Sequence, residues 1–221
     1  MRFSHEMLRL YAVTDRSWVG KQTLYEQVED ALKGGVTLVQ LREKTLSKAD
    51  FIREAIEMRA LCHRYHVPLI INDRVDVALE SGADGVHVGM EDMSVAEIRK
   101  KVPREFIIGA TCKTVEQAKE AEKAGADYMG VGAVFPSPTK QNAIRITNEQ
   151  LREICAAVSI PAVAIGGISL DNISTLCGCG AAGVAVVSAI FAAEHITEAT
   201  AALREKVKGV YDENSIDHCG K

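Results

Sequence analysis

The sequence predicts an α/β protein built as a single (β/α)8 TIM barrel. Its 221 residues are enough for one barrel domain with a large core. Short apolar runs recur along the chain with charged amphipathic stretches between them, the alternation that builds parallel βαβ units. Eight such runs are present, and eight strands can close a barrel. We expect the barrel over residues 1–210 and a flexible tail over residues 211–221.

The strands are expected where the apolar runs lie. Most of these runs are continuous rather than alternating, as expected for strands covered on both faces. The expected strands are Leu8–Thr14, Leu38–Arg42, Leu69–Asn72, Gly85–Val88, Phe106–Thr111, Tyr128–Phe135, Ala162–Gly166 and Gly183–Ser188.

The helices are expected in the segments between these runs, where apolar residues recur at three- and four-residue spacing. The expected helices are Leu24–Gly34, Lys48–Tyr65, Val75–Ser81, Ser94–Lys101, Thr114–Ala124, Thr147–Val158 and Asn172–Cys177. Several of them end at a glycine, as at Gly34, Gly82 and Gly125. A glycine can take the left-handed conformation that ends a helix before the next strand.

The composition excludes some classes of function. Hydrophobic residues make up 47% and charged residues 25% of the chain, the values of an ordinary globular protein. The net charge is −4 and no block of basic residues is present, so we expect no nucleic-acid partner. No apolar stretch is long enough to span a membrane and the start lacks a secretory signal, which favours a cytoplasmic protein. A homo-oligomer is compatible with the sequence.

The loops after the strands form the active face of a parallel barrel, so polar residues at the carboxyl ends are the first candidates. At the end of the second expected strand, alternation sends Gln40, Arg42 and Lys44 to one side, where two cations and an amide could bind an anion. The alternative is a surface ion-pair cluster with Glu43.

Two acidic residues follow the third and fourth expected strands. Asp73 and Asp92 could each give a carboxylate oxygen to Mg2+, which usually takes one or two carboxylates and completes its shell with water and substrate phosphate. Helix N-capping is the alternative for both. His87, on the fourth strand, is either a catalytic residue or a core histidine satisfied by hydrogen bonds.

The last two strands offer a phosphate site. The seventh expected strand ends at Gly166, which Gly167 follows, and the eighth ends at Ser188, places where barrels often bind phosphate through backbone N–H groups and a short helix. The segment from Phe135 to Asn142 carries two hydroxyls and a lysine between prolines, which is typical of a substrate-holding lid or of a plain surface turn.

Cys112 and Lys113 follow the fifth strand. No general base is visible beside them, so the sequence does not favour a reactive thiol or a Schiff-base lysine.

Taken together, these residues resemble the thiamine-phosphate synthase family, which joins a pyrimidine diphosphate to a thiazole phosphate. The resemblance covers nearly the whole domain in order, so it is much more specific than any one motif. It rests on Tyr11-Ala12-Val13-Thr14-Asp15, QLREK at 40–44, INDRVDVAL at 71–79, GADGVHVGMED at 82–92, GADYMGVGAVFPSPTK at 125–140, AIGGI at 164–168 and VVSAI at 186–190.

The resemblance implies roles for individual residues. The pyrimidine diphosphate would be bound by Gln40, Arg42, Lys44, Asn72, Thr111 and Lys140. Among these, Arg42, Lys44, Thr111 and Lys140 would be the catalytic residues. Ser137 and Thr139 would contact either phosphate group, and Gly167, Val187 and Ser188 would bind the phosphate of the thiazole. Asp73 and Asp92 would hold Mg2+, the expected cofactor. The implied chemistry is dissociative, with loss of diphosphate before the thiazole nitrogen attacks.

The chain departs from the family pattern at a few positions. Met90 stands where Gln is frequent, Thr111 and Lys113 where Ser and His are frequent, and Asn142 where Asp is common. The related thiazole tautomerases are thought to use a His in the segment around Lys113, and that His is absent here. The synthase is therefore favoured, with a tautomerase or a non-catalytic thiazole-phosphate-binding protein as the alternatives.

Overall fold

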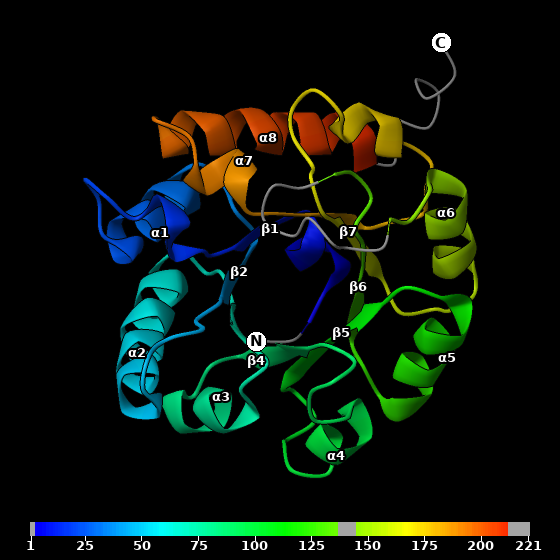
Figure 1. Ribbon diagram of the computed structural model, residues 1–221, viewed down its shortest axis with the longest axis horizontal. Coiled ribbons are helices and arrows are strands. Elements are labelled where there is room, and N and C mark those ends of the chain that lie inside the picture. Colours follow the sequence, from blue (N-terminus) through cyan, green and yellow to red (C-terminus); the bar gives the residue numbers. More distant parts are fainter. Residues whose placement is uncertain (1–2, 137–144, 212–221) are drawn as a thin grey trace.

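Eight parallel strands form a closed barrel at the centre of the computed structural model, which describes residues 3–136 and 145–211 (Figure 1). Each strand pairs with the next along the chain, and β1 closes the barrel on β8. The strands are β1 (Leu10–Val13), β2 (Leu38–Leu41), β3 (Leu69–Asn72), β4 (Gly85–Val88), β5 (Ile107–Cys112), β6 (Tyr128–Gly132), β7 (Ala162–Ile165) and β8 (Gly183–Val186). The predicted fold class is confirmed.

Helices surround the barrel. They are α1 (Leu24–Lys33), α2 (Lys48–Arg64), α3 (Val75–Ser81), α4 (Val95–Arg99), α5 (Val115–Ala124), α6 (Asn148–Ala156), α7 (Ser188–Phe191) and α8 (Ile196–Tyr211), with 3-10 turns η1 (His5–Leu8), η2 (Arg16–Trp18) and η3 (Ile173–Leu176). The helix predicted at Asn172–Cys177 is present only as the short 3-10 helix η3 and not as an α-helix. The long helix α8 was missed by the sequence prediction. No described helix is both long and apolar enough to cross a membrane.

Several predicted strands run further than the observed ones. The predicted strand ending at Phe135 stops at Gly132, and the one ending at Ser188 stops at Val186. The residues after these points, such as Val134, are also apolar and buried, although they no longer belong to the strand. Hydrophobicity alone therefore does not mark where a strand leaves the sheet.

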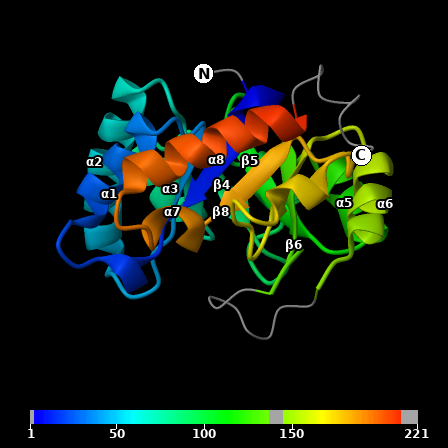
Figure 2. The same ribbon diagram turned by 90° about the horizontal axis from the view of Figure 1, so that it is seen from above.

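The core has two layers. The larger one lies between the strands and the helices, and the smaller one fills the barrel itself. The buried residues of the inner layer are Leu8, Tyr11, Val13, Leu38, Ile70, Ile107, Tyr128, Val163 and Ala185. Leu8 comes from η1, which covers the amino end of the barrel, at the opposite end from α7 (Figure 2). The barrel is therefore closed at the amino ends of its strands and accessible at their carboxyl ends.

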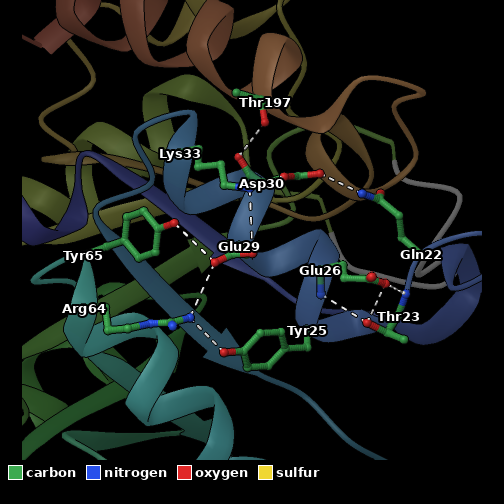
Figure 3. Close-up of polar contacts among 10 residues, drawn as sticks. All are labelled: Gln22, Thr23, Tyr25, Glu26, Glu29, Asp30, Lys33, Arg64, Tyr65 and Thr197. Atoms are coloured by element: carbon green, nitrogen blue, oxygen red, sulfur yellow. Dashed lines mark hydrogen bonds and ion pairs between the residues drawn. The ribbon is translucent and has the colours of Figure 1, made fainter.

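Polar contacts fix helix α1 against its neighbours (Figure 3). Thr23 and Glu26 form a capping box at its start, which satisfies backbone N–H groups that the helix cannot pair itself. Glu29 contacts Arg64 of α2, and the backbone oxygen of Asp30 accepts a hydrogen bond from Thr197 of α8. These contacts place α1 between its neighbours α2 and α8.

Glycines end two helices as predicted. Gly82 after α3 and Gly125 after α5 have φ values of 68° and 94°, in the left-handed region. After α1 the left-handed residue is Gly35, with φ 99°, and not Gly34.

Candidate active site

A cavity of about 560 Å³ opens at the carboxyl ends of the strands, and every strand or the segment after it contributes to its lining. Seven predicted site residues line it: Gln40, Arg42, Asn72, Thr111, Gly167, Val187 and Ser188. The predicted residues Ser137, Thr139 and Lys140 lie outside the described residues. Lys44, Asp73 and Asp92 are described but do not line this cavity.

Of the three residues that alternation places on one side at the end of β2, two line the cavity, and the third, Lys44, pairs with Asp73 instead. Gln40 and Arg42 line the cavity, whereas the carboxylate of Glu43 is buried and pairs with Arg16 of η2 at 2.8 Å. Arg42 Nη1 donates to Asp15 Oδ2 at 2.8 Å. The proposed ion-pair cluster with Glu43 therefore does not include Arg42, which remains on the cavity side.

Asp15 is a site residue that the sequence prediction missed. It lines the cavity after β1 and orients the Arg42 guanidinium. Partial burial raises the pKa of Asp15, but hydrogen bonds from Ser17 and the charge of Arg42 outweigh it and hold that pKa below its usual value. Asp15 is therefore a carboxylate at neutral pH, and it keeps the Arg42 guanidinium in one orientation before any ligand binds.

A chain of hydrogen bonds among side chains crosses the inside of the barrel, and all of its residues except Tyr128 line the cavity. Gln40 Nε2 donates to the Tyr11 hydroxyl at 2.6 Å, and that hydroxyl lies 2.8 Å from the hydroxyl of Tyr128. The Tyr128 hydroxyl lies 3.0 Å from Nδ1 of His87, whose Nε2 lies 3.1 Å from the Thr111 hydroxyl. The chain therefore links Gln40 on β2 to Thr111 on β5, two residues predicted to bind substrate.

Two glycines make room for this chain. A Cβ on Gly109 would lie 2.2 Å from Cζ of Tyr128 and 2.5 Å from Nδ1 of His87, and a Cβ on Gly130 would lie 3.1 Å from Cε1 of His87. Glycine within a strand often marks such a close approach, so Gly109 and Gly130 were a signal in the sequence that went unused. His87 satisfies hydrogen bonds as the core alternative predicted, yet it also lines the cavity.

Burial raises the pKa of both tyrosines of the chain well above the ordinary value. Both hydroxyls therefore stay protonated, and the chain positions its end residues rather than carrying charge.

Asp73 and Asp92 lie together at the rim. Asp73 Oδ2 accepts from Lys44 Nζ at 2.6 Å, and Asp92 Oδ2 accepts from the backbone N–H of Gly89 at 2.7 Å. Partial burial, together with the charge of Asp73, raises the pKa of Asp92. The two carboxylates are thus close enough to repel each other.

The capping alternative for these two residues is wrong. The residue before α3 is Arg74, without a capping side chain, and α4 is capped by Ser94. Asp73 instead has φ 62°, a left-handed conformation that is uncommon for a residue other than glycine. Strained backbone of this kind occurs often at functional sites.

The pair suits a magnesium ion better than a transition metal. Two repelling carboxylates beside an open cavity provide hard oxygen ligands and leave further positions for water and phosphate. Among the described residues, no group of three or more His, Cys, Asp or Glu side chains could hold a metal, whereas a zinc site would need three or four such ligands.

The opposite sector of the cavity is formed mainly by backbone. Gly166 and Gly167 after β7 have φ values of 104° and 64°. A Cβ on Gly167 would lie 2.2 Å from the backbone oxygen of Pro136, so contact with the segment after β6 requires this glycine whatever the ligand. Val187 and Ser188 begin α7, whose first N–H groups have no partner within the helix. Such a sector suits a single phosphate group.

Comparison with known proteins gives the same assignment over most of the chain. The family model described as "Thiamine monophosphate synthase" matches residues 10–190. The thiamine-phosphate synthase of Ruminiclostridium cellulolyticum is 49% identical over 89% of this chain and 93% of that protein. That of Alkaliphilus oremlandii is 45% identical over 94% of this chain and 100% of that protein.

A solved structure agrees. Thiamine phosphate pyrophosphorylase from Pyrococcus furiosus superposes with a TM-score of 0.86 at 41% sequence identity, covering 93% of this chain and 98% of that one. The match extends over the strands that form the cavity, so the chain described here belongs to the thiamine monophosphate synthase family.

Proposed function

We propose that this chain forms thiamine phosphate and diphosphate from a pyrimidine diphosphate and a thiazole phosphate by a dissociative mechanism that uses Mg2+. If the thiazole substrate is the carboxylate, CO2 is released as well. The formation of thiamine phosphate follows from membership of the family, and the enzyme is a transferase. The metal, the mechanism and the roles of the residues are the parts that need a test.

One observation carries the proposal: the mouth of the barrel has two anion-binding sectors of different chemistry. The first consists of charged residues that follow β2, β3 and β4, namely Arg42, Lys44, Asp73 and Asp92. The second consists of backbone after β7 and β8, with Gly167, Val187 and Ser188. Two sectors that each suit an anion, at the same end of the barrel, favour a reaction that joins two phosphorylated substrates.

In the first sector, Asp73 and Asp92 would hold Mg2+ on the diphosphate. Bound there, the ion would neutralise negative charge that develops on the diphosphate as it leaves. Arg42, already oriented by Asp15, donates N–H groups to the same oxygens, and Lys44 can exchange its contact with Asp73 for one with the diphosphate. Lys140 is assigned to this group by the family resemblance.

The reaction breaks the bond between the methylene carbon of the pyrimidine and the diphosphate oxygen, and the bonding electrons leave with the diphosphate. The thiazole nitrogen then donates its electron pair to the methylene cation. Gln40, Asn72 and Thr111 hold the pyrimidine diphosphate, while Gly167, Val187 and Ser188 hold the thiazole phosphate so that its nitrogen faces the carbon. Ser137 and Thr139 are assigned to either phosphate by the resemblance. No protein nucleophile takes part.

The decisive experiment is a two-substrate assay with and without Mg2+. We expect thiamine phosphate and diphosphate in equal amounts with the metal and little product in excess EDTA. Release of no diphosphate from the purified protein with both substrates and Mg2+ would overturn the proposal. Conversion of a thiazole carboxylate phosphate that survives EDTA would favour the tautomerase instead, and ligand binding without turnover would indicate a sensor.

Asp92→Ala tests the metal ligand. We expect the rate to fall by about 100-fold or more, because charge on the leaving group is no longer neutralised. Glu91→Ala is the matched control, since Glu91 is the exposed neighbour and makes no hydrogen bond or ion pair with the residues that the structure describes. Equal losses in the two variants would contradict the assignment.

A further inference from the structure

Lys113 lines the cavity, and neither the fold nor the proposed reaction has given it a role. It follows the last residue of β5. Along this strand Thr111 lines the cavity while Cys112 is buried between the barrel and the helices, so alternation places Lys113 on the same side as Thr111. Both observations put this half-buried lysine at the mouth of the barrel.

The basic residues around the cavity differ in their partners. Arg42 pairs with Asp15 and Lys44 pairs with Asp73. Of the two Lys or Arg residues that line the cavity, Arg42 has a carboxylate partner and Lys113 has none within residues 3–136 and 145–211. A half-buried ammonium without a counter-ion has lost part of its hydration, and no ion pair replaces it. This favours binding of an anionic ligand.

Local structure does not explain the lysine. The backbone N–H of Lys113 donates to Oε1 of Gln117, and the cap of α5 is the Thr114 side chain. The turn between β5 and α5 is therefore held without the ammonium group. Many other side chains would serve this turn equally well.

We infer that Lys113 binds an oxyanion of a substrate, beyond the groups assigned above; this rests on the proposed function. In the ring of strands, β5 follows the strands that carry Asp73 and Asp92 and precedes those of the glycine sector. Two substrate groups fit this position: an oxygen of the diphosphate, or a carboxylate on the thiazole ring. Both are anionic oxygens that an ammonium group binds by charge-assisted hydrogen bonds.

The test is Lys113→Met, with Lys119→Met as the matched control. Lys119 is exposed on α5, so its loss changes the net charge equally without touching the cavity. Calorimetry would measure four probes: inorganic diphosphate with Mg2+, inorganic phosphate, and the thiazole phosphate with and without its carboxylate. We expect Lys113→Met to weaken binding of the diphosphate, or of the carboxylated thiazole alone, by about 10- to 100-fold.

The pattern of losses identifies the group that is bound. A loss confined to diphosphate places the ammonium on the leaving group, and a loss confined to the carboxylated thiazole places it on that carboxylate. Affinities that stay within about twofold of Lys119→Met for both probes would overturn the inference. So would an equal loss for every probe, including inorganic phosphate, since a long-range charge effect would act in that way.

Two further variants separate charge from packing. Lys113→Arg should restore the affinity, because it keeps a positive charge of similar reach. Lys113→His should bind the oxyanion better relative to wild type at about pH 6 than at about pH 8, because an imidazole with an ordinary pKa of about 6.5 is charged only at the lower pH. Failure of both would contradict the inference, even if Lys113→Met were too unstable to measure.

The outcome can be told apart from failure of the proposed function. If the wild-type protein makes no thiamine phosphate, the proposed function fails whatever the variants do. If the wild type is active and Lys113→Met binds all four probes as Lys119→Met does, only the role of Lys113 fails.

Discussion

At the scale of residues, the site depends on side chains that hold other side chains in position. Arg42 is oriented by Asp15, and Gln40 and Thr111 are the ends of the chain through Tyr11, Tyr128 and His87. Substrate-binding groups that are already held in place lose little entropy when the ligand arrives. The two tyrosines therefore help to hold Gln40 and Thr111 in place.

Tyr128→Phe tests this chain. The change removes one hydrogen-bond partner from Tyr11 and one from His87 at a fully buried position, so we expect a loss of about 1–3 kcal/mol in the free energy of unfolding. Urea denaturation would measure it. We also expect a lower kcat, because Gln40 and Thr111 are held less firmly.

The control for that variant is Tyr25→Phe. The Tyr25 hydroxyl accepts from Arg64 on the outside of the barrel, so its removal should change the unfolding free energy by less than about 0.5 kcal/mol. Similar stabilities for Tyr128→Phe and the wild type would show that the buried chain of hydrogen bonds is not important for the stability of the fold.

The carboxylate pair predicts a dependence on pH. Partial burial and the nearby Asp73 raise the pKa of Asp92, so its folded form takes up a proton at higher pH than an unfolded chain does. Asp92 therefore stabilises the folded state at low pH, and this contribution to the free energy of unfolding is lost as the pH rises through the raised pKa. Affinity for Mg2+ should change in the opposite direction and fall as Asp92 is protonated.

Asp92→Asn separates the two effects. Without metal near neutral pH, this variant should unfold at the same temperature as the wild type or higher, because it removes the repulsion with Asp73. Added Mg2+ should raise the unfolding temperature of the wild type but not that of the variant. Thermal unfolding with and without Mg2+ measures both, and a variant that Mg2+ still stabilises fully would contradict the assignment of Asp92 as a ligand.

At the scale of elements, α1 and α8 touch across the first and last parts of the barrel. A Cβ on Gly34, at the end of α1, would lie 2.5 Å from Cβ of Thr200 and 2.7 Å from the backbone oxygen of Thr197, both in α8. The position therefore requires glycine because of packing, and not because of its φ, which is −73°.

Gly34→Ala should consequently destabilise the protein by about 1–3 kcal/mol, since α8 must shift to admit the methyl group. Gly209→Ala is the matched control, because nothing lies within 4 Å of a Cβ at that position of α8. There alanine should stabilise the helix by about 0.5–1 kcal/mol. Chemical denaturation of both variants measures these changes, and equal effects of the same sign would refute the close approach.

At the scale of the whole molecule, closure of the barrel brings the site together. Asp15 follows β1 and Ser188 follows β8, yet both line one cavity because β1 pairs with β8. Leu8 in the inner core closes the amino end of the barrel, so the open face is at the carboxyl ends of the strands. Arg42 and the backbone sector thus share one cavity, and Lys44, Asp73 and Asp92 follow β2, β3 and β4 at the same end of the barrel.

The sequence by itself determined the barrel, the eight strands to within a few residues and seven residues that line the cavity. Patterns of apolar residues are local, and strand ends in a parallel barrel share one face, so both can be predicted without coordinates. The turn η3 and the missed helix α8 show where these local patterns were not sufficient.

Only the tertiary structure decided which polar groups are partners. Asp15 with Arg42, and Tyr11 with Tyr128, are brought together by strands that are distant in the sequence. The capping of Asp73 and Asp92 was undecided in the sequence and was excluded by where α3 and α4 begin. For Lys113 the sequence could not show that it lacks a carboxylate partner within residues 3–136 and 145–211, because ion pairing is a property of the folded chain and not of a local pattern.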